Sequence, residues 1–289
     1  MTVQDEMQRT FGEVDVDGSL TAIDLTTGHR VETSGQTAYA LASVAKLPLT
    51  WALMTLHERG DLDAAEPLAL RPAERTRGPV GTGRLHDAIT MSARDACYYA
   101  MSLSDNGAAD AVWDLVGRDR LTATLAALDL PDLQLRAPMR EYFRLLDRQV
   151  ARSGLDEDAL LDVDPADLDA IDPARVSSAT TNALAAFLAQ VHRAAGSGSP
   201  ADRQVLELLG HQLVRNRLAS GFPATDVDVR GKTGTMLALR HEAGIVTFPD
   251  GRAYAVAVLT RSRTLDIHYR VDHAIGEAAR LAVQHLRRT

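Results

Sequence analysis

Lysine is almost absent from this sequence. Only Lys46 and Lys232 are lysines among its 31 basic residues, and the others are arginines. An arginine supplies a permanent charge, whereas a lysine supplies a compact ammonium on a flexible stem that can also lose its proton. A chain that uses arginine wherever plain positive charge serves is expected to keep lysine where this chemistry is needed. The scarcity therefore marks Lys46 and Lys232 as candidate functional residues.

Cysteine is scarce and long apolar segments are absent. The single Cys97 excludes an internal disulfide and fits a reducing compartment, and its Ala-rich helical surroundings predict a buried, inert thiol. No segment approaches the ~20 consecutive apolar residues that span a bilayer. Residues 1–13 are polar and have no signal-peptide pattern. We therefore expect a cytoplasmic protein, with a secreted mature form that has lost its leader as the alternative.

Composition and missing motifs also limit the partners. The net charge of −8 disfavours nonspecific binding to nucleic acid or to an anionic membrane. The nine histidines form no H-E-x-x-H motif and have no cysteine partners, so we predict no metal site. Neither glycine-rich nucleotide-binding motif occurs, so we predict no cofactor. The expected partner is a small molecule. The sequence does not determine the oligomeric state, and a monomer is the expectation.

Strand patterns lie near the two ends of the chain, and helical patterns lie between them. Strands are predicted over 19–24, 30–33, 227–232, 243–247 and 253–260. Helices are predicted over 5–11, 41–58, 90–102, 106–116, 121–128, 181–194, 200–211 and 269–286. This order predicts an α+β fold of the α/β sandwich type. Residues 1–40 and 215–289 would form a mixed antiparallel sheet with flanking terminal helices, and residues 41–214 an inserted all-α domain.

The segment Ser43-Val44-Ala45-Lys46 is the first chemical motif. Ser43 and Lys46 are three residues apart in a predicted helix, so they share a face. A serine at a helix start lies in the positive field of the N-terminus, and a neighbouring amine with a lowered pKa can take its proton. Lys46 is embedded in apolar sequence, an unusual place for a solvated charge. We interpret the pair as a nucleophile and its activating amine; an N-cap serine and a surface lysine are the alternative.

Ser104-Asp105-Asn106 is the second motif and precedes the predicted helix 106–116. In isolation it indicates a loop and a helix start, with Ser104 or Asp105 as the N-cap. The functional interpretation gives Ser104 a hydroxyl that relays a proton. It gives Asn106 an amide that binds a substrate amide.

Lys232-Thr233-Gly234 is the third motif and ends a Val-rich predicted strand. A strand end with a turn glycine would have the same sequence. In the functional interpretation, Lys232 and Thr233 hold a substrate carboxylate. Gly234, which has no side chain, lets the strand edge approach the substrate closely. Thr235 would give its backbone N–H to an oxyanion hole together with that of Ser43.

The three motifs, in this order, resemble the S-x-x-K, S-D-N and K-T-G set of the serine β-lactamases and penicillin-binding proteins, and within them class A. The resemblance extends from about residue 19 to the last residue. It implies a sheet domain and an all-α domain with the active site in the cleft between them. The roles that it implies are the acylated nucleophile Ser43, its proton acceptor Lys46, the proton shuttle Ser104, the substrate ligand Asn106 and the carboxylate anchors Lys232 and Thr233.

The sequence departs from class A at the residue that activates the deacylating water. The family places a glutamate roughly 35 residues beyond the S-D-N serine, and Glu141 stands 37 residues beyond Ser104 (141 − 104). We therefore name Glu141 as the catalytic base. Leu145 occupies the place of the usual asparagine, and the segment 144–175 is acidic and longer than the usual loop. A surface position on an Arg-rich helix is the alternative for Glu141, and Glu157 is the second candidate base.

An arginine near the K-T-G strand often helps this family to bind the substrate carboxylate. The residue before Gly244, where that arginine is often found, is Ala243. Arg240 lies close by in the sequence and is our candidate for this role. Arg217 is the second candidate, and a solvated surface charge is the alternative for either.

Three functions share the acylation of Ser43. The first, which we predict, is a class A β-lactamase-like serine hydrolase that opens β-lactam amides and uses Glu141 to hydrolyse the acyl-enzyme. The second is an intracellular serine amidase, esterase or acyltransferase for a peptide-like carboxylate or a natural product. The third is a penicillin-binding module that deacylates slowly. The polar N-terminus, Leu145 and the long acidic segment favour the second.

Overall fold

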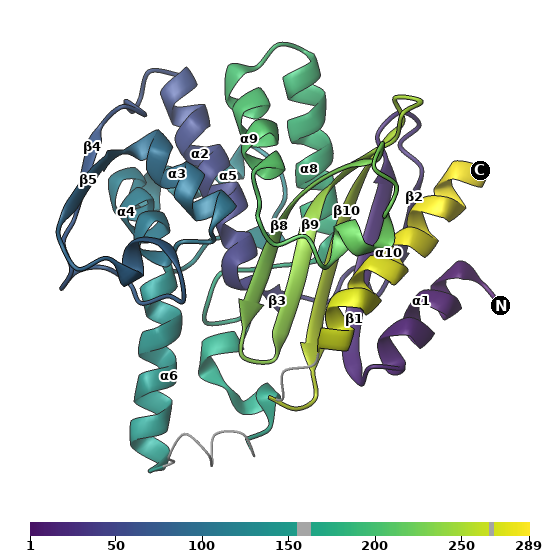
Figure 1. The fold of residues 1–289 in the computed structure, drawn as a ribbon, viewed down its shortest axis with the longest axis horizontal. Coiled ribbons are helices and arrows are strands. Elements are labelled where there is room, and N and C mark those ends of the chain that lie inside the picture. Colours follow the sequence, from purple (N-terminus) through teal and green to yellow (C-terminus); the bar gives the residue numbers. More distant parts are fainter. Residues whose placement is uncertain (155–162, 266–268) are drawn as a thin grey trace.

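A five-stranded antiparallel sheet forms the centre of the computed structural model, which describes residues 1–154, 163–265 and 269–289 (Figure 1). Its strands lie in the order β2-β1-β10-β9-β8. Their bounds are Val16–Asp24 (β1), Arg30–Thr33 (β2), Asp228–Met236 (β8), Leu239–Thr247 (β9) and Ala253–Ser262 (β10). The five predicted strands coincide with these to within a few residues. The predicted α+β class is confirmed.

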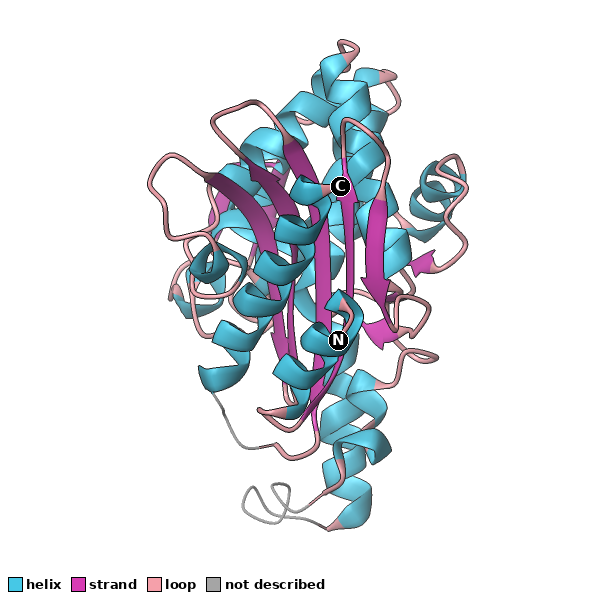
Figure 2. Ribbon diagram, turned by 90° about the vertical axis from the view of Figure 1, so that its right-hand side faces the viewer, coloured by secondary structure: helices cyan, strands magenta, loops and turns pink. Residues whose placement is uncertain are grey.

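Different helices cover the two faces of the sheet (Figure 2). On one face lie α1 (Val3–Gly12), the short 3₁₀ helix η5 (Leu218–Gly221) and α10 (Tyr269–Arg288), and on the other lies α8 (Thr181–Gly196). Side chains of β10 alternate between the two: Val256 and Val258 join the apolar cluster under α10, and Ala255 and Ala257 join the cluster that includes α8. Successive strand residues point to opposite faces. A strand buried on both faces is therefore apolar throughout.

Most of the remaining chain is helical and lies beside the sheet. Its α-helices are α2 (Lys46–Glu58), α3 (Ala93–Ser102), α4 (Asn106–Val116), α5 (Arg118–Ala126), α6 (Met139–Ser153) and α9 (Pro200–Gly210). Its 3₁₀ helices are η1 (Ala42–Ala45), η2 (Gly81–Arg84), η3 (Pro165–Asp167) and η4 (Asp169–Ile171). The predicted helices agree with these to within a few residues. The exceptions are the 3₁₀ start of the predicted helix 41–58 and residues 90–92.

Short strands also occur within the part of the chain whose pattern predicts helices almost throughout, and one more, β3, lies directly before it. One small sheet has the order β3-β7-β6, and a second consists of β4 and β5. Their bounds are Tyr39–Ala40 (β3), Pro67–Leu70 (β4), Ile89–Ser92 (β5), Leu133–Gln134 (β6) and Ser178–Ala179 (β7). Such short strands carry too little alternation to be recognised, so the predicted helix over residues 90–92 is wrong. The domain boundaries after residues 40 and 214 stay a prediction.

Cys97 lies on α3 and is fully buried, as predicted. Burial raises the pKa of its thiol to about 12. Since the thiolate is the reactive form, this cysteine is inert at neutral pH. Within the described ranges, no helix combines the length and the apolar character that a membrane crossing needs.

Candidate active site

Ser43 lies where the chain turns from the small β3-β7-β6 sheet into α2. Ala42, the first residue of η1, has a positive φ of 46°. Lys46 begins α2, and its Nζ donates a hydrogen bond of 2.8 Å to Ser43 Oγ. Only 1% of the Lys46 surface is exposed, and Ala45, not Ser43, is the N-cap of α2. The structure therefore has the predicted pairing of hydroxyl and amine, and not a capping serine with a surface lysine.

Lys46 Nζ is surrounded by uncharged oxygen atoms. Besides Ser43 Oγ, it donates to the Ser104 carbonyl and to Asn106 Oδ1, both at 2.7 Å, and it lies 3.4 Å from Ser104 Oγ. Complete burial lowers the pKa of the Lys46 amine to about 7, although nearby carboxylates oppose the shift. A large fraction of this amine is therefore neutral near pH 7 and can accept a proton from Ser43.

Asp105 fixes the S-D-N turn between α3 and α4. As the N-cap of α4, its carboxylate accepts hydrogen bonds from the Ala108 N–H at 3.1 Å and the Thr82 hydroxyl at 2.8 Å. It also accepts one from the Thr82 N–H. The preceding residue, Ser104, has a positive φ of 61°. The fixed turn directs both the carbonyl and the hydroxyl of Ser104 to Lys46.

Asn106 is the first residue of α4 and is buried. Its Oδ1 accepts from Lys46, and its Nδ2 donates to the Arg77 carbonyl at 2.9 Å. Both ends of the amide are thus engaged within the protein. In this arrangement Asn106 supports Lys46, and its predicted contact with a substrate amide stays a prediction.

Lys232 brings a second amine to Ser104. Its Nζ donates to Ser104 Oγ at 3.0 Å and to the Thr233 carbonyl at 2.9 Å. Burial, followed by the charge of Lys46, holds the pKa of Lys232 well below its usual value, while Glu242 opposes the shift. The Ser104 hydroxyl therefore lies between two amines and is placed to pass a proton.

Gly234 allows β8 to lie directly against the turn that carries Ser43 (residues 41–44). A Cβ at this position would come within 2.8 Å of the Leu41 carbonyl oxygen and 3.0 Å of Val44 Cγ2. No other residue fits there without displacing the turn. The close approach in the structure is to the segment around Ser43, and the predicted approach of Gly234 to the substrate stays a prediction. Thr235 follows on the same strand, and the oxyanion-hole role of its N–H stays a prediction.

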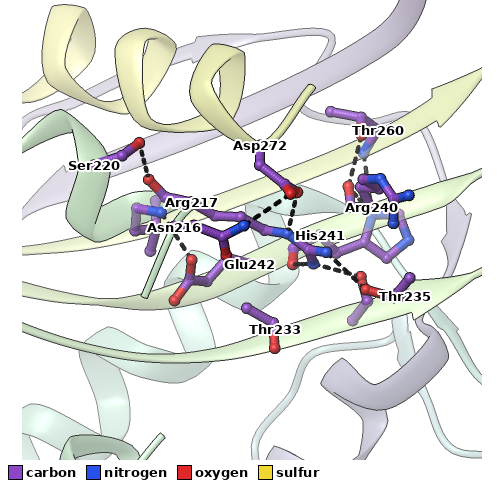
Figure 3. A network of polar contacts seen from close by, with 12 residues as sticks. Asn216, Arg217, Ser220, Thr233, Thr235, Arg240, His241, Glu242, Thr260 and Asp272 are labelled. Atoms are coloured by element: carbon purple, nitrogen blue, oxygen red, sulfur yellow. Dashed lines mark hydrogen bonds and ion pairs between the residues drawn. The ribbon is translucent and has the colours of Figure 1, made fainter. Parts of the chain in front are cut away.

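Arg217, and not Arg240, directs its guanidinium at the K-T-G strand (Figure 3). Arg217 Nη1 donates hydrogen bonds to the carbonyl oxygens of Gly234 and His241, both at 2.8 Å. Its Nη2 donates to Thr235 Oγ1 at 2.7 Å, and its Nε donates to Asp272 Oδ1 at 2.6 Å. Arg240 lies on β9, a strand that contacts both η5 and α10. Burial, and then the charge of Arg217, lower the pKa of Arg240. Arg217, the second candidate from the sequence, is therefore better placed than Arg240 to act beside the K-T-G strand.

A buried carboxylate lies behind the same strand. Glu242 accepts hydrogen bonds from Gln212 Nε2 at 2.8 Å and from the Leu218 N–H at 2.7 Å. Gln212 Oε1 in turn accepts from the Thr233 N–H. Burial raises the pKa of Glu242. The sequence analysis missed this chain of contacts, although a glutamate within a Val- and Ile-rich strand was a usable signal.

The structure does not bring Glu141 to the amines. Glu141 lies in the first turn of α6, and its carboxylate contacts Arg144 at 2.8 Å and Arg148 at 3.6 Å on the same helix. This arrangement matches the alternative of a residue on an Arg-rich helix. The second candidate base, Glu157, lies outside the described residues.

Asp110 is the carboxylate beside Lys46 that the sequence analysis missed. It accepts hydrogen bonds from the N–H groups of Met139 (2.6 Å) and Arg140 (2.8 Å) and from the Thr76 hydroxyl (2.6 Å). Burial raises its pKa. With Met139 it lines a cavity of about 10 Å³ next to Lys46, room for about one water molecule. Its position four residues after Asn106 on one helix face was the available signal.

Comparisons with known proteins bear on the family and the fold of this chain. A sequence model described as "Beta-lactamase enzyme family" matches residues 2–286. The beta-lactamase regulatory protein BlaB of Streptomyces cacaoi is 30% identical over 278 residues, which cover 89% of this chain and 88% of that protein. The fold is similar to that of PBP-A (TM-score 0.78, 17% identity, 99% of this chain and 96% of that one). It is also similar to that of a beta-lactamase from Sphaerobacter thermophilus (TM-score 0.80, 22% identity, 99% and 97%).

Proposed function

The chain belongs to the beta-lactamase enzyme family, and from this membership we propose that Ser43 is acylated by β-lactams or by peptide-like carboxylates with a similar amide. The observation that carries the proposal is the buried Lys46 amine, which lies 2.8 Å from Ser43 Oγ and has a pKa of about 7. A neutral amine at hydrogen-bond distance from a hydroxyl is the arrangement that nucleophilic catalysis requires.

The acylation step follows from these contacts. Lys46 accepts the Ser43 proton while Ser43 Oγ forms a bond to the carbonyl carbon. The backbone N–H groups of Ser43 and Thr235 stabilise the resulting oxyanion. When the C–N bond breaks, the Ser104 hydroxyl gives its proton to the leaving nitrogen and is reprotonated from Lys46. The products are a Ser43 ester and an amine, which in a β-lactam remain one molecule.

A substrate carboxylate is expected to bind beside Lys232, Thr233 and Arg217. Burial holds the Lys232 pKa low in the free protein. An anionic group next to this amine favours its charged form, so the substrate itself would complete the charge at its binding site. Arg217 adds a permanent positive charge at Thr235.

The acyl-enzyme is expected to be long-lived. The described carboxylates whose charge acts on Lys46 are Asp110 and Asp105, and both hold N–H and hydroxyl groups of the protein. Rapid hydrolysis, as predicted from the sequence, depended on Glu141, which is paired with arginines on its own helix. A slow-deacylating, penicillin-binding module is therefore the function that the site supports best. The regulatory role named for the Streptomyces cacaoi relative is compatible with a stable adduct whose formation signals the presence of the drug.

Intact mass during incubation with benzylpenicillin tests this proposal. We expect a single adduct on Ser43 that persists after free drug is removed, and little turnover of a chromogenic cephalosporin. Absence of any adduct contradicts the acylation itself. Fast loss of the adduct together with cephalosporin turnover contradicts slow deacylation alone and restores the β-lactamase function.

The acylation rate is expected to depend on pH through Lys46. Only the neutral amine can accept the Ser43 proton, and its pKa is about 7. The rate should therefore be nearly constant above pH 7 and fall about tenfold per pH unit below it. Adduct formation measured by intact mass across the range from about pH 5 to about pH 8 provides the test. A rate that does not change across this range contradicts the role of Lys46 as the base.

Glu141→Gln is expected to leave the lifetime of the adduct unchanged. The substitution removes a charge that pairs with Arg144 and Arg148 and that contacts neither amine. The measurement is the decay of the benzylpenicillin adduct, with the wild-type protein as the reference. A clearly longer lifetime in the variant would return Glu141 to the deacylation step.

A further inference from the structure

His241 is a fully buried histidine that lies under the nucleophile segment. It belongs to β9, and its ring packs edge-on against Tyr39 with 6.1 Å between the ring centres. Nε2 lies 2.9 Å from the Ala40 carbonyl oxygen. Nδ1 lies 3.1 Å from the Thr260 nitrogen and 2.8 Å from the Arg240 carbonyl oxygen. The ring therefore connects β9 and β10 to the residue three positions before Ser43.

These contacts favour the tautomer with its proton on Nε2. In that form Nε2 donates to Ala40 and Nδ1 accepts from the Thr260 N–H, which satisfies two of the three contacts. The other neutral tautomer satisfies only the contact with Arg240. Burial lowers the pKa of His241 to about 4, so the ring is neutral at pH 7.

The Ala40 carbonyl has no partner on the small sheet. Ala40 is opposite Ser178 in the antiparallel pair of β3 and β7, and the next residue, Leu41, donates to the Ser177 carbonyl at 2.8 Å. Because hydrogen bonds alternate along an antiparallel strand, the carbonyl of Ala40 points away from β7. It is buried, and an unpaired buried carbonyl is costly. His241 satisfies it.

His241 also contacts the K-T-G strand, β8, through its backbone. The His241 carbonyl accepts from Arg217 Nη1 at 2.8 Å, and the same nitrogen donates to Gly234 O (Figure 3). His241 is the register partner of Gly234, the glycine that lies against Leu41. One residue thus contacts the nucleophile segment through its ring and the K-T-G strand through its backbone.

We propose that His241 is a positioning residue for Ser43, whose imidazole N–H fixes the Ala40 carbonyl and thereby the distance between the nucleophile turn and β8. Ala42, with its positive φ, lies two residues after Ala40. A shift of Ala40 and Leu41 would move Ser43 away from Lys46 and from the Thr235 N–H. The inference rests on the proposed acylation of Ser43.

Two matched variants separate this role from general stability. In His241→Gln the side-chain amide keeps an N–H donor at about the reach of Nε2. In His241→Asn the shorter side chain can accept from the Thr260 N–H but does not reach the Ala40 carbonyl. We expect His241→Asn to be acylated by benzylpenicillin about a hundredfold more slowly, and His241→Gln to keep the rate to within about fivefold. The dissociation constant of the noncovalent complex should be unchanged in both, because its contacts lie at Lys232, Thr233 and Arg217, and Arg217 contacts residue 241 through the backbone carbonyl, which both variants keep.

Three results overturn the proposal. They are wild-type rates in a folded His241→Asn variant, equal losses in the two folded variants, and a loss that appears only in the dissociation constant. If His241→Asn does not fold, His241→Met, which fills the space without a donor, takes its place under the same criteria. If the wild-type protein forms no penicillin adduct, the proposed function fails; the rate of Ser43 labelling by a fluorophosphonate in the same variants still tests the positioning.

Discussion

Lys46→Met is expected to lower the rate of Ser43 acylation by benzylpenicillin by about a thousandfold or more, within the range that general-base catalysis contributes. Methionine has a similar length and fits a buried site, but it cannot accept a proton. Lys46 Nζ is the atom that contacts Ser43 Oγ, at 2.8 Å. The rate is measured by intact mass, and thermal unfolding establishes that the variant is folded.

Lys46→Arg is the matched control for charge. A guanidinium keeps the positive charge permanently and does not lose its proton, so the same large loss is expected if the amine acts as a base. Ser43→Ala sets the zero of the assay, because no adduct can form. Acylation of Lys46→Arg at the wild-type rate would show that the charge of Lys46, and not its basicity, is what Ser43 needs.

Ser104→Ala is expected to have the second largest effect, a loss of about a hundredfold in acylation by a β-lactam. Its hydroxyl lies 3.0 Å from Lys232 Nζ and 3.4 Å from Lys46 Nζ. The backbone carbonyl of residue 104, which accepts from Lys46 at 2.7 Å, is kept in the variant. The substitution therefore removes the proton shuttle while the base retains a direct anchor.

The leaving group distinguishes this role from a general disturbance of the site. An amide nitrogen must be protonated to leave, whereas the oxygen of an activated ester leaves without a proton. Ser104→Ala should therefore lose far more activity on the β-lactam than on a nitrophenyl ester. An equal loss on both substrates would mean that the hydroxyl acts by supporting Lys46 or Lys232, and not by passing a proton.

The sequence predicted those parts of the site that depend on local geometry. A separation of three positions in a helical turn brings Ser43 beside Lys46. Asp105 follows Ser104 directly and is the N-cap of α4. The scarcity of lysine selected the two amines that meet at Ser104. Alternation and apolar runs located the five central strands, because a half-buried or fully buried strand has to follow that pattern.

Choices among candidates of the same chemical type depended on distant contacts. The sequence gives no reason to prefer Arg217 over Arg240. In the structure it is Arg217 that donates a hydrogen bond to the Thr235 side chain, 18 residues further along the chain. The separation between Ser104 and Glu141 matches the one that the family has between its S-D-N serine and its catalytic glutamate. Glu141 nevertheless lies on α6, where its carboxylate contacts Arg144 and Arg148.

The sequence by itself therefore determined the motifs on which the proposed acylation chemistry depends, because each of these motifs is local. The tertiary structure alone decided which guanidinium contacts β8, which carboxylates act on Lys46 and how the Ala40 carbonyl is held. Those contacts join segments as far apart as the 201 residues between His241 and Ala40. Over such separations no periodicity links the residues, and only packing of the sheet against the nucleophile turn brings them together.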